Sequence, residues 1–267
     1  MESLQEKASK IKIVFFDIDD TLRVKNTGYL PDSVAIVFDK LREKGIVTAI
    51  ATGRNLAGVV PEIKELQPDY FVTANGAYVE DKHHQTIYSH PLPQETVQAL
   101  LDWLISVDSD YVFYGKDALR VSRWTPTVQD AIEIIYGKLD ADPDFYKTHD
   151  VYQLLSLSDH DQEIELPESL ANEVRRVRWH PNSSDIVPVS GSKAVGAQKV
   201  LDELGLTADE MMNFGDELND LELFDLAGLS VAMKVSHPEI LERADFVTDS
   251  VEADGIEKAL IELGIIE

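Results

Sequence analysis

The sequence predicts an α/β protein in which a smaller α+β module interrupts a doubly wound, mainly parallel sheet of the Rossmann-like kind. Strand-like apolar runs alternate with amphipathic helical segments over residues 1–83 and again over residues 186–267. Such alternation is typical of a parallel sheet covered by helices. Between these segments, residues 84–185 carry strands and helices in a looser order, with polar residues between the strands. We therefore expect a core formed by the two outer segments and a separate inserted domain.

The first core segment predicts three strands and a helix. Residues 11–16 form an apolar, β-branched and aromatic run, as expected of a buried strand. A helix should span about residues 32–44, because apolar side chains recur there at helical spacing and Gly45 follows as a stop. The next strands are expected at residues 46–51 and 70–73.

The inserted segment predicts a hairpin, because two apolar runs flank the turn-forming sequence Gly115-Lys116-Asp117. Its strands are expected at residues 111–114 and 119–123, and two helices at residues 97–104 and 128–139. The alternating pattern of a parallel sheet resumes near Ile186. There a helix is expected over residues 193–204, ended by Gly205, followed by strands at residues 211–214 and 229–233.

Composition narrows the range of functions. The chain has 49 acidic and 24 basic residues, a formal net charge of −25, whereas nucleic-acid binding usually needs a basic face. No cysteine is present, which excludes disulfides and thiolate chemistry. No apolar run approaches the roughly 20 residues of a membrane span, and the polar residues 1–10 resemble neither a signal peptide nor an anchor. We expect a cytoplasmic protein that binds neither nucleic acid nor membranes.

The most informative motif is Asp17-Ile18-Asp19-Asp20-Thr21, directly behind the first predicted strand. Open α/β sheets bind their ligands at the carboxyl edge of the strands. Side chains two apart on a strand share a face but lie roughly 6–7 Å apart along it, so Asp17 and Asp19 can converge on one ligand only if the chain leaves the strand just after Asp17. Carboxylates gathered in this way favour a divalent cation and acid–base chemistry. A solvated acidic turn is the alternative.

Three further strand ends or helix starts carry reactive groups: Thr52, Lys193 and the segment 215–220. Each has an ordinary structural alternative. Thr52 could cap a helix, Lys193 could be solvated, and the acids of segment 215–220 could favour the start of a helix. A parallel sheet, however, would bring all of them to one edge together with Asp17 and Asp19. A phosphorylated substrate of so acidic a protein would need strong local positive charge, which a metal and a lysine or arginine would supply.

With these four motifs in order, the chain resembles the haloacid dehalogenase superfamily. Within it, the chain looks like the Cof-type phosphatases with a type IIB cap, whose cap domain is inserted between the second and third motifs. The subfamily resemblance also rests on segments 51–54, 73–77 and 254–256. Asp20 stands where family members often carry glycine, and Ala194 follows the motif lysine where glycine is common. The resemblance implies a catalytic core of residues 1–83 and 186–267 and an inserted cap of residues 84–185.

The resemblance implies a Mg²⁺-dependent phosphatase that hydrolyses small phosphorylated metabolites, chiefly sugar phosphates, through an aspartyl-phosphate. Asp17 would be the nucleophile and Asp19 the general acid and base. The implied site residues are Asp17, Asp19, Thr52 and Lys193 for catalysis; Thr52, Gly53, Arg54, Asn75, Lys193 and Asn219 for substrate binding; and Asp17, Asp19, Asp216, Asn219 and Asp220 for the metal or its bound waters.

Two other classes of protein remain as alternatives. A phospho-accepting signalling module also uses clustered aspartates, a threonine and a lysine on a parallel sheet, but it would need neither Asp19 as an acid nor a large insertion. A non-hydrolytic sensor of sugar phosphates could keep the same scaffold without turnover. The sequence does not identify the substrate, the residues of the insertion that would contact it, or the oligomeric state.

Overall fold

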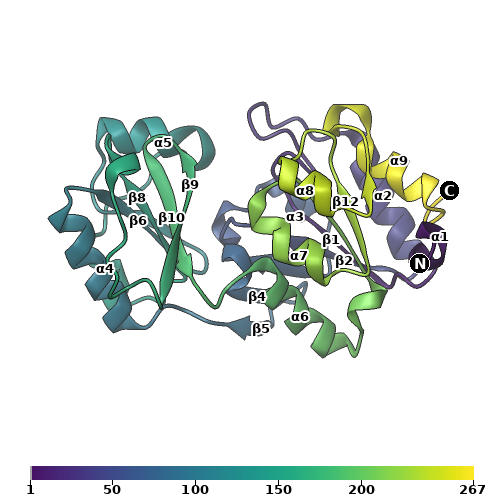
Figure 1. Cartoon of the computed structure of the whole chain (residues 1–267), viewed down its shortest axis with the longest axis horizontal. Coiled ribbons are helices and arrows are strands. Elements are labelled where there is room, and N and C mark those ends of the chain that lie inside the picture. Colours follow the sequence, from purple (N-terminus) through teal and green to yellow (C-terminus); the bar gives the residue numbers. More distant parts are fainter. Residues whose placement is uncertain (1) are drawn as a thin grey trace. The chain divides into compact units, whose positions relative to one another are not determined.

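The computed structural model describes residues 2–267, which form two compact units. The first unit contains the chain up to Gly53, together with Val60–Tyr88 and Ser192–Glu267. The second unit contains Arg54–Val59 and Ser89–Gly191. Both ends of the chain lie in the first unit (Figure 1). One continuous insertion and one short loop of the core segment therefore build the second unit.

The first unit is built on an eight-stranded sheet. In spatial order its strands are β13 (Phe246–Val247), β12 (Leu229–Ala232), β11 (Met211–Gly215), β1 (Ile13–Phe16), β2 (Val47–Ala51), β3 (Tyr70–Thr73), β4 (Tyr78–Asp81) and β5 (Thr86–Ser89). The pairs from β13 to β3 are parallel, and β4 is antiparallel to β3. The predicted doubly wound, mainly parallel sheet is confirmed.

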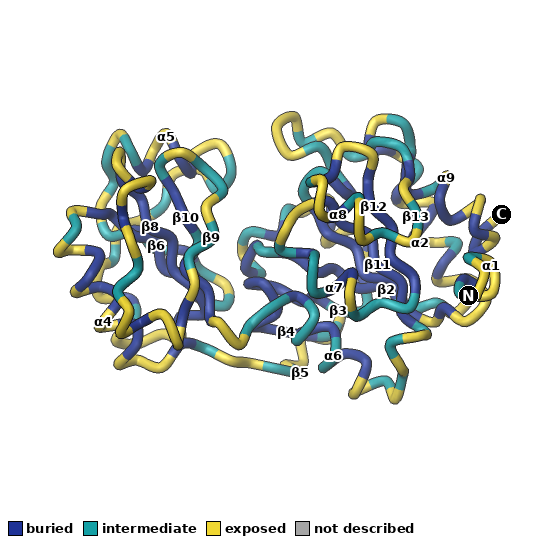
Figure 2. The backbone as a smooth tube through the Cα atoms, viewed as in Figure 1, coloured by how far each residue is buried: buried dark blue, intermediate teal, exposed yellow. Residues whose placement is uncertain are grey.

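Helices cover both faces of this sheet (Figure 1). The helices of the unit are α1 (Leu4–Ala8), α2 (Asp32–Glu43), α3 (Pro61–Glu65), α6 (Lys193–Leu204), α7 (Leu221–Leu226), α8 (Pro238–Arg243) and α9 (Gly255–Glu262). On one face Phe15 packs in a core with Ala197 of α6 and Leu223 of α7. On the other face Phe16 meets Phe38 of α2 with ring centroids 5.0 Å apart. The strands are consequently buried on both faces, as the dark tube of β11 and β2 shows in Figure 2.

The second unit is built on a five-stranded sheet whose recorded strand pairs are all antiparallel. In spatial order the strands are β7 (Leu119–Val121), β6 (Asp110–Tyr114), β8 (Gln153–Leu157), β10 (Ser183–Pro188) and β9 (Val174–His180). Helix α4 (Gln94–Ser106) packs against Phe113 and Leu154, and helix α5 (Pro126–Tyr136) against Val112 and Leu155. Because neighbouring strand residues point to opposite faces, the two helices cover opposite faces of this sheet.

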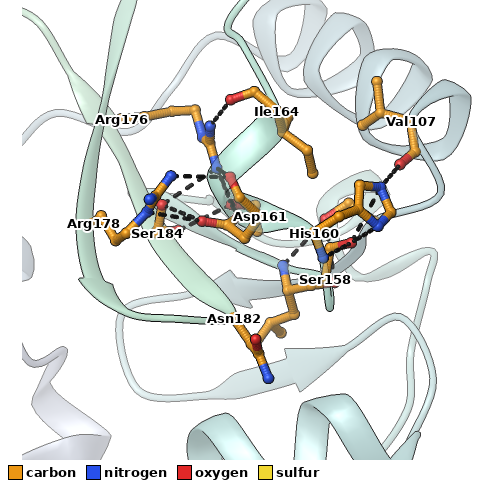
Figure 3. Close-up of polar contacts among 12 residues, drawn as sticks. Val107, Ser158, His160, Asp161, Ile164, Arg176, Arg178, Asn182 and Ser184 are labelled. Atoms are coloured by element: carbon orange, nitrogen blue, oxygen red, sulfur yellow. Dashed lines mark hydrogen bonds and ion pairs between the residues drawn. The ribbon is translucent and has the colours of Figure 1, made fainter.

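A buried ion-pair network ties one long connection to this second sheet (Figure 3). Asp161 lies on the short helical turn Asp161–Glu163 and has no exposed side-chain surface. Its carboxylate accepts hydrogen bonds from Arg176 Nη2 at 2.6 Å and from Ser184 Oγ at 2.6 Å. Ser156 Oγ donates to the same carboxylate at 2.7 Å. The segment between β8 and β9 is thus anchored to β8, β9 and β10 through one aspartate.

Residues 186–188, near which the pattern of a parallel sheet was expected to resume, belong to the second sheet. Ile186 was expected to begin the return to the parallel sheet, but it lies in β10, paired antiparallel with Leu154. The parallel core resumes only with α6, and the two units divide at Gly191 and Ser192. An apolar strand run carries no information about the direction of its neighbour, so residues 186–188 resembled a core strand.

No helix among residues 2–267 is both long enough and apolar enough to cross a lipid bilayer.

Candidate active site

The acidic motif begins where β1 ends. Strand β1 stops at Phe16, and the amide of Asp17 makes one last bond to Phe214 O at 3.1 Å. The chain then turns tightly: the amide of Leu22 donates to Ile18 O at 3.0 Å, and Asp20 adopts a positive φ of 58°. This is the departure from the strand that convergence of Asp17 and Asp19 requires. Asp19 is close enough that its negative charge contributes to raising the pKa of Asp17.

Lys193 lies between two carboxylates of this site. It opens α6 directly after Ser192, whose hydroxyl accepts from the amide of Val195. Its Nζ lies 2.7 Å from Asp220 Oδ1 and 3.0 Å from Asp17 Oδ1, and its side chain has no exposed surface. Burial by itself would lower the pKa of Lys193, but the two carboxylates outweigh burial and raise it above its usual value. Lys193 is therefore a buried ammonium group paired with two carboxylates rather than a solvated one.

The loop after β11 supplies two more carboxylates. Asp216 accepts a hydrogen bond from Thr21 Oγ1 at 2.8 Å, and Asp220 Oδ2 accepts the amides of Asp216 at 3.2 Å and Glu217 at 3.3 Å. The backbone at Gly215 packs against the side chain of Asp220. A Cβ at position 215 would lie 2.6 Å from Asp220 Cγ. A side chain at position 215 would therefore displace Asp220, which is paired with Lys193.

The three acids form a compact group that is short of positive charge. Oxygen atoms of Asp17, Asp216 and Asp220 all lie within 4.8 Å of one another, and all three residues are buried. Burial, and then repulsion by the neighbouring acids, raise the pKa of Asp216 to about 9. Burial also raises the pKa of Asp17 to about 7, although Lys193 opposes the rise. Clustered carboxylate oxygens are the ligands that Mg²⁺ prefers, and a divalent cation would balance their charge. The residues present therefore fit such an ion.

A second group of predicted residues lies where β2 and β3 end. Thr52 is buried, and its carbonyl accepts the amide of Asn75 at 3.1 Å. The side-chain amide of Asn219 donates from Nδ2 to Asn75 Oδ1 at 3.1 Å. Gly53 adjoins this pair, because a Cβ there would lie 3.2 Å from Asn75 Oδ1. Thr52 does not cap a helix; the short turn that follows, Leu56–Gly58, is capped by Asn55.

Arg54 is the predicted site residue that belongs to the second unit. It is buried, its Nη1 donates to Gly58 O at 2.9 Å, and its guanidinium lies 5.8 Å from the ring centre of Tyr136. Arg54 is thus not the exposed surface arginine that its position in a loop would suggest. The other predicted residues, Asp17, Asp19, Thr52, Gly53, Asn75, Lys193, Asp216, Asn219 and Asp220, all lie in the first unit.

Thr21 is a site residue whose role the sequence reasoning missed. It was part of the first motif, but no function was assigned to it. Its side chain is fully buried and holds one oxygen of Asp216 from the opposite loop. The available signal was the place of Thr21 in the first motif, two residues after Asp19 and close behind a strand expected to be buried. A hydroxyl buried there would need a hydrogen-bond partner, and a nearby carboxylate could accept its proton.

Comparison with known proteins confirms the resemblance to the haloacid dehalogenase superfamily. A family model described as haloacid dehalogenase-like hydrolase matches residues 14–260. The putative phosphatase YkrA of Bacillus subtilis (strain 168) is 35% identical over 263 residues, which cover 96% of this chain and 99% of that protein. The structure of the subclass IIB sugar phosphatase BT4131 matches with a TM-score of 0.83 at 27% identity, covering 96% of this chain and all of that one.

A further relative is longer than this chain. A putative bifunctional phosphatase/peptidyl-prolyl cis-trans isomerase of Streptococcus pyogenes serotype M6 (strain ATCC BAA-946 / MGAS10394) is 48% identical over 264 residues. The match covers 99% of this chain but 56% of that protein. The chain thus spans little more than half the length of this relative and nearly the whole of YkrA.

Proposed function

This chain belongs to the haloacid dehalogenase-like hydrolase family, and from that premise we propose that it is a Mg²⁺-dependent phosphatase of small phosphorylated metabolites. The observation that carries the proposal is the buried group of Asp17, Asp216 and Asp220 around the ammonium of Lys193. Burying three carboxylates together is costly unless a cation compensates their charge, and a buried lysine beside them can bind an anionic substrate. YkrA, named as a putative phosphatase, and BT4131, named as a sugar phosphatase, each match 96% of this chain, which supports the reaction class.

In the proposed reaction Asp17 attacks the phosphorus atom and the bond to the leaving oxygen breaks, which produces an aspartyl-phosphate on Asp17. Asp19 donates a proton to the leaving oxygen. In the second step Asp19 takes a proton from a water molecule that attacks the same phosphorus, so that inorganic phosphate leaves and Asp17 is restored. Splitting hydrolysis in this way replaces one difficult displacement by two easier ones.

The surrounding residues would bind and orient the phosphoryl group. The Thr52 hydroxyl would donate a hydrogen bond to a phosphoryl oxygen, and Lys193 would place positive charge beside it. Bound Mg²⁺, held by the carboxylates of Asp17 and Asp216 and the backbone carbonyl of Asp19, would reduce the repulsion between Asp17 and the incoming dianion. Asp220 would keep Lys193 in place, since the two already form an ion pair at 2.7 Å.

The substrate is proposed to be a sugar phosphate, since the subclass IIB relative BT4131 is named as a sugar phosphatase. The second unit is proposed to act as a cap that excludes water and contacts the leaving group. The boundaries expected at residues 83/84 and 185/186, and the cytoplasmic location, stay predictions. A panel of sugar phosphates, nucleotides, flavin mononucleotide and pyridoxal phosphate would identify the substrate.

The decisive experiment is Mg²⁺-dependent turnover of p-nitrophenyl phosphate by wild-type protein and by Asp17→Asn and Asp19→Asn. We expect multiple turnovers in Mg²⁺, none in EDTA and none in Asp17→Asn. Asp19→Asn should lose roughly 10²–10⁴-fold in kcat, the usual value of positioned proton transfer. Full activity in EDTA would refute the metal requirement. A single phosphorylation of Asp17 without turnover would instead favour the phospho-accepting alternative.

A further inference from the structure

Three consecutive residues after β3 adopt left-handed backbone conformations. Ala74 has φ 49°, Asn75 has φ 52° and Gly76 has φ 87°. Alanine rarely adopts this conformation, because its Cβ approaches the following carbonyl and no polar side chain compensates. Strain of this kind persists only where the surroundings impose it. All three residues of this left-handed turn, Ala74–Gly76, are buried, so packing within the first unit imposes it.

The left-handed turn packs against the first turn of α6, the helix that carries Lys193. A Cβ on Gly76 would lie 2.0 Å from the carbonyl oxygen of Ser192, the residue immediately before Lys193. From the other side, a Cβ on Gly196 would lie 2.9 Å from Gly76 Cα. The two glycines therefore allow backbone-to-backbone contact, and a side chain at Gly76 would displace the first turn of α6.

The same turn also holds the loops that follow β2 and β11. The amide of Asn75 donates to Thr52 O at 3.1 Å, and Asn75 Oδ1 accepts from Asn219 Nδ2 at 3.1 Å. Thr52, Lys193 and Asn219 come from three separate segments of the chain, and no single element carries two of them. The left-handed turn is in contact with all three segments.

We propose that the left-handed turn Ala74–Gly76 is a positioning element that places Lys193, Thr52 and Asn219 relative to one another. This inference rests on the proposed function, because the residues it positions are those that would bind the phosphoryl group. The turn acts through these residues and need not touch the substrate itself. Placement to a fraction of an ångström matters, since a displacement of about 1 Å costs on the order of 10²-fold in rate.

The first test compares Gly76→Ala with Gly205→Ala. Both glycines have positive φ, 87° and 65°, so alanine strains the backbone at both. Gly205 ends the same helix α6 but has open space around its Cα, whereas Gly76 faces the carbonyl of Ser192. We expect Gly76→Ala to lose on the order of 10²-fold in kcat at a temperature where both variants are folded. Gly205→Ala should keep the wild-type kcat; a wild-type kcat in folded Gly76→Ala would overturn the proposal.

A second pair of variants separates positioning from substrate contact and covers the case in which Gly76→Ala does not fold. Valine at position 75 cannot adopt φ 52°, whereas glycine adopts it freely. Asn75→Val should therefore lose on the order of 10²-fold in kcat, and Asn75→Gly should retain at least about tenfold more activity than Asn75→Val. Equal losses in the two variants would overturn the proposal, because they would assign the effect to the amide alone.

Crystal structures of the same variants keep this test independent of the proposed reaction. In Gly76→Ala or Asn75→Val, Lys193 Nζ should move away from Asp17 or Asp220 relative to the wild-type distances of 3.0 and 2.7 Å. Unchanged distances would overturn the positioning role, even if the wild-type protein is an active phosphatase. Wild-type protein that hydrolyses no phosphorylated compound would refute the proposed function, while displacement of Lys193 would still support the positioning role.

Discussion

Lys193 shows how a residue's surroundings can reverse its expected behaviour. A cation at the first position of a helix is opposed by the helix dipole, and a lysine there is most often solvated. In this protein the side chain is completely buried between Asp17 and Asp220. The sequence identified the residue and its place at the start of a helix, but only the folded chain brings the two acids to it. Removing Lys193 should therefore affect stability as well as activity.

We predict that Lys193→Met destabilises the metal-free protein by about 3–5 kcal/mol, because it leaves buried carboxylates without their counter-charge. Urea unfolding in EDTA, followed by circular dichroism, measures this change. Lys199→Met on the same helix is the matched control; Lys199 is only partly buried and its Nζ lies 5.4 Å from the ring centre of Tyr88. Similar losses in the two variants would contradict the importance of the buried ion pairs.

The raised pKa values of Asp17 and Asp216 predict how stability depends on pH and Mg²⁺. In the metal-free protein they lie at about 7 and about 9, above the usual 3.8. The folded state therefore binds more protons than the unfolded chain, and its stability falls as the pH rises through these values. Since Mg²⁺ binds deprotonated carboxylates, the increase in Tm caused by Mg²⁺ over EDTA should be larger at about pH 9 than at about pH 6.

Differential scanning fluorimetry at the two pH values measures this difference, with Asp216→Asn as the control. The amide cannot titrate, so the variant should lose much of the pH dependence of the Mg²⁺ effect. An effect of Mg²⁺ that is equal at both pH values in the wild-type protein, or larger at the lower one, would contradict the assignment of the acids as metal ligands.

At the scale of single elements, the sequence predicted the first and last residues of a helix well where both a capping residue and a terminating glycine were present. Helix α6 was expected over residues 193–204 and spans Lys193–Leu204, because Ser192 caps its start and Gly205, with φ 65°, ends it. Strand β3 was likewise expected at residues 70–73 and spans Tyr70–Thr73. Strand β10 differs: the parallel pattern was expected to resume near Ile186, but Ile186 lies in β10, which pairs antiparallel with β8 and β9. Pairing depends on residues far away in the sequence, which a local pattern does not contain.

The turn Asp161–Glu163 carries a prediction about the stability of the second unit. Asp161→Ala would leave Arg176 without its counter-charge, and the Arg176 side chain is only 11% exposed. We expect a loss of about 3–5 kcal/mol, the usual cost of removing one partner of a buried ion pair. Thermal unfolding followed by tryptophan fluorescence is suitable, because Trp103, Trp124 and Trp179 all lie in this unit.

Glu163→Ala is the matched control, since Glu163 lies on the same turn but is exposed. It should change stability by less than about 0.5 kcal/mol, as surface substitutions usually do. A loss in Asp161→Ala no greater than in this control would show that the network does not anchor the segment between β8 and β9.

For the whole molecule, the dominant property is the formal net charge of −25. Repulsion among like charges destabilises a compact state, and salt screens it over roughly 10 Å at about 0.1 M. We expect Tm in EDTA to rise when NaCl is increased from about 10 to about 200 mM, because the screened repulsion exceeds the weakened surface ion pairs. A fall in Tm over this range would mean that attractive pairs dominate.

The sequence by itself determined the α/β class of the core, the alternation of strands and helices within it, and the presence of four charged or polar motifs at predicted strand ends or helix starts. These follow from short-range rules of burial and capping, which act over a few residues. The tertiary structure decided that Lys193 is buried between Asp17 and Asp220, that Thr21 holds Asp216, and that the left-handed turn Ala74–Gly76 lies against Ser192. Such contacts join segments far apart along the chain, so they exist only once the sheet has brought its strand ends together.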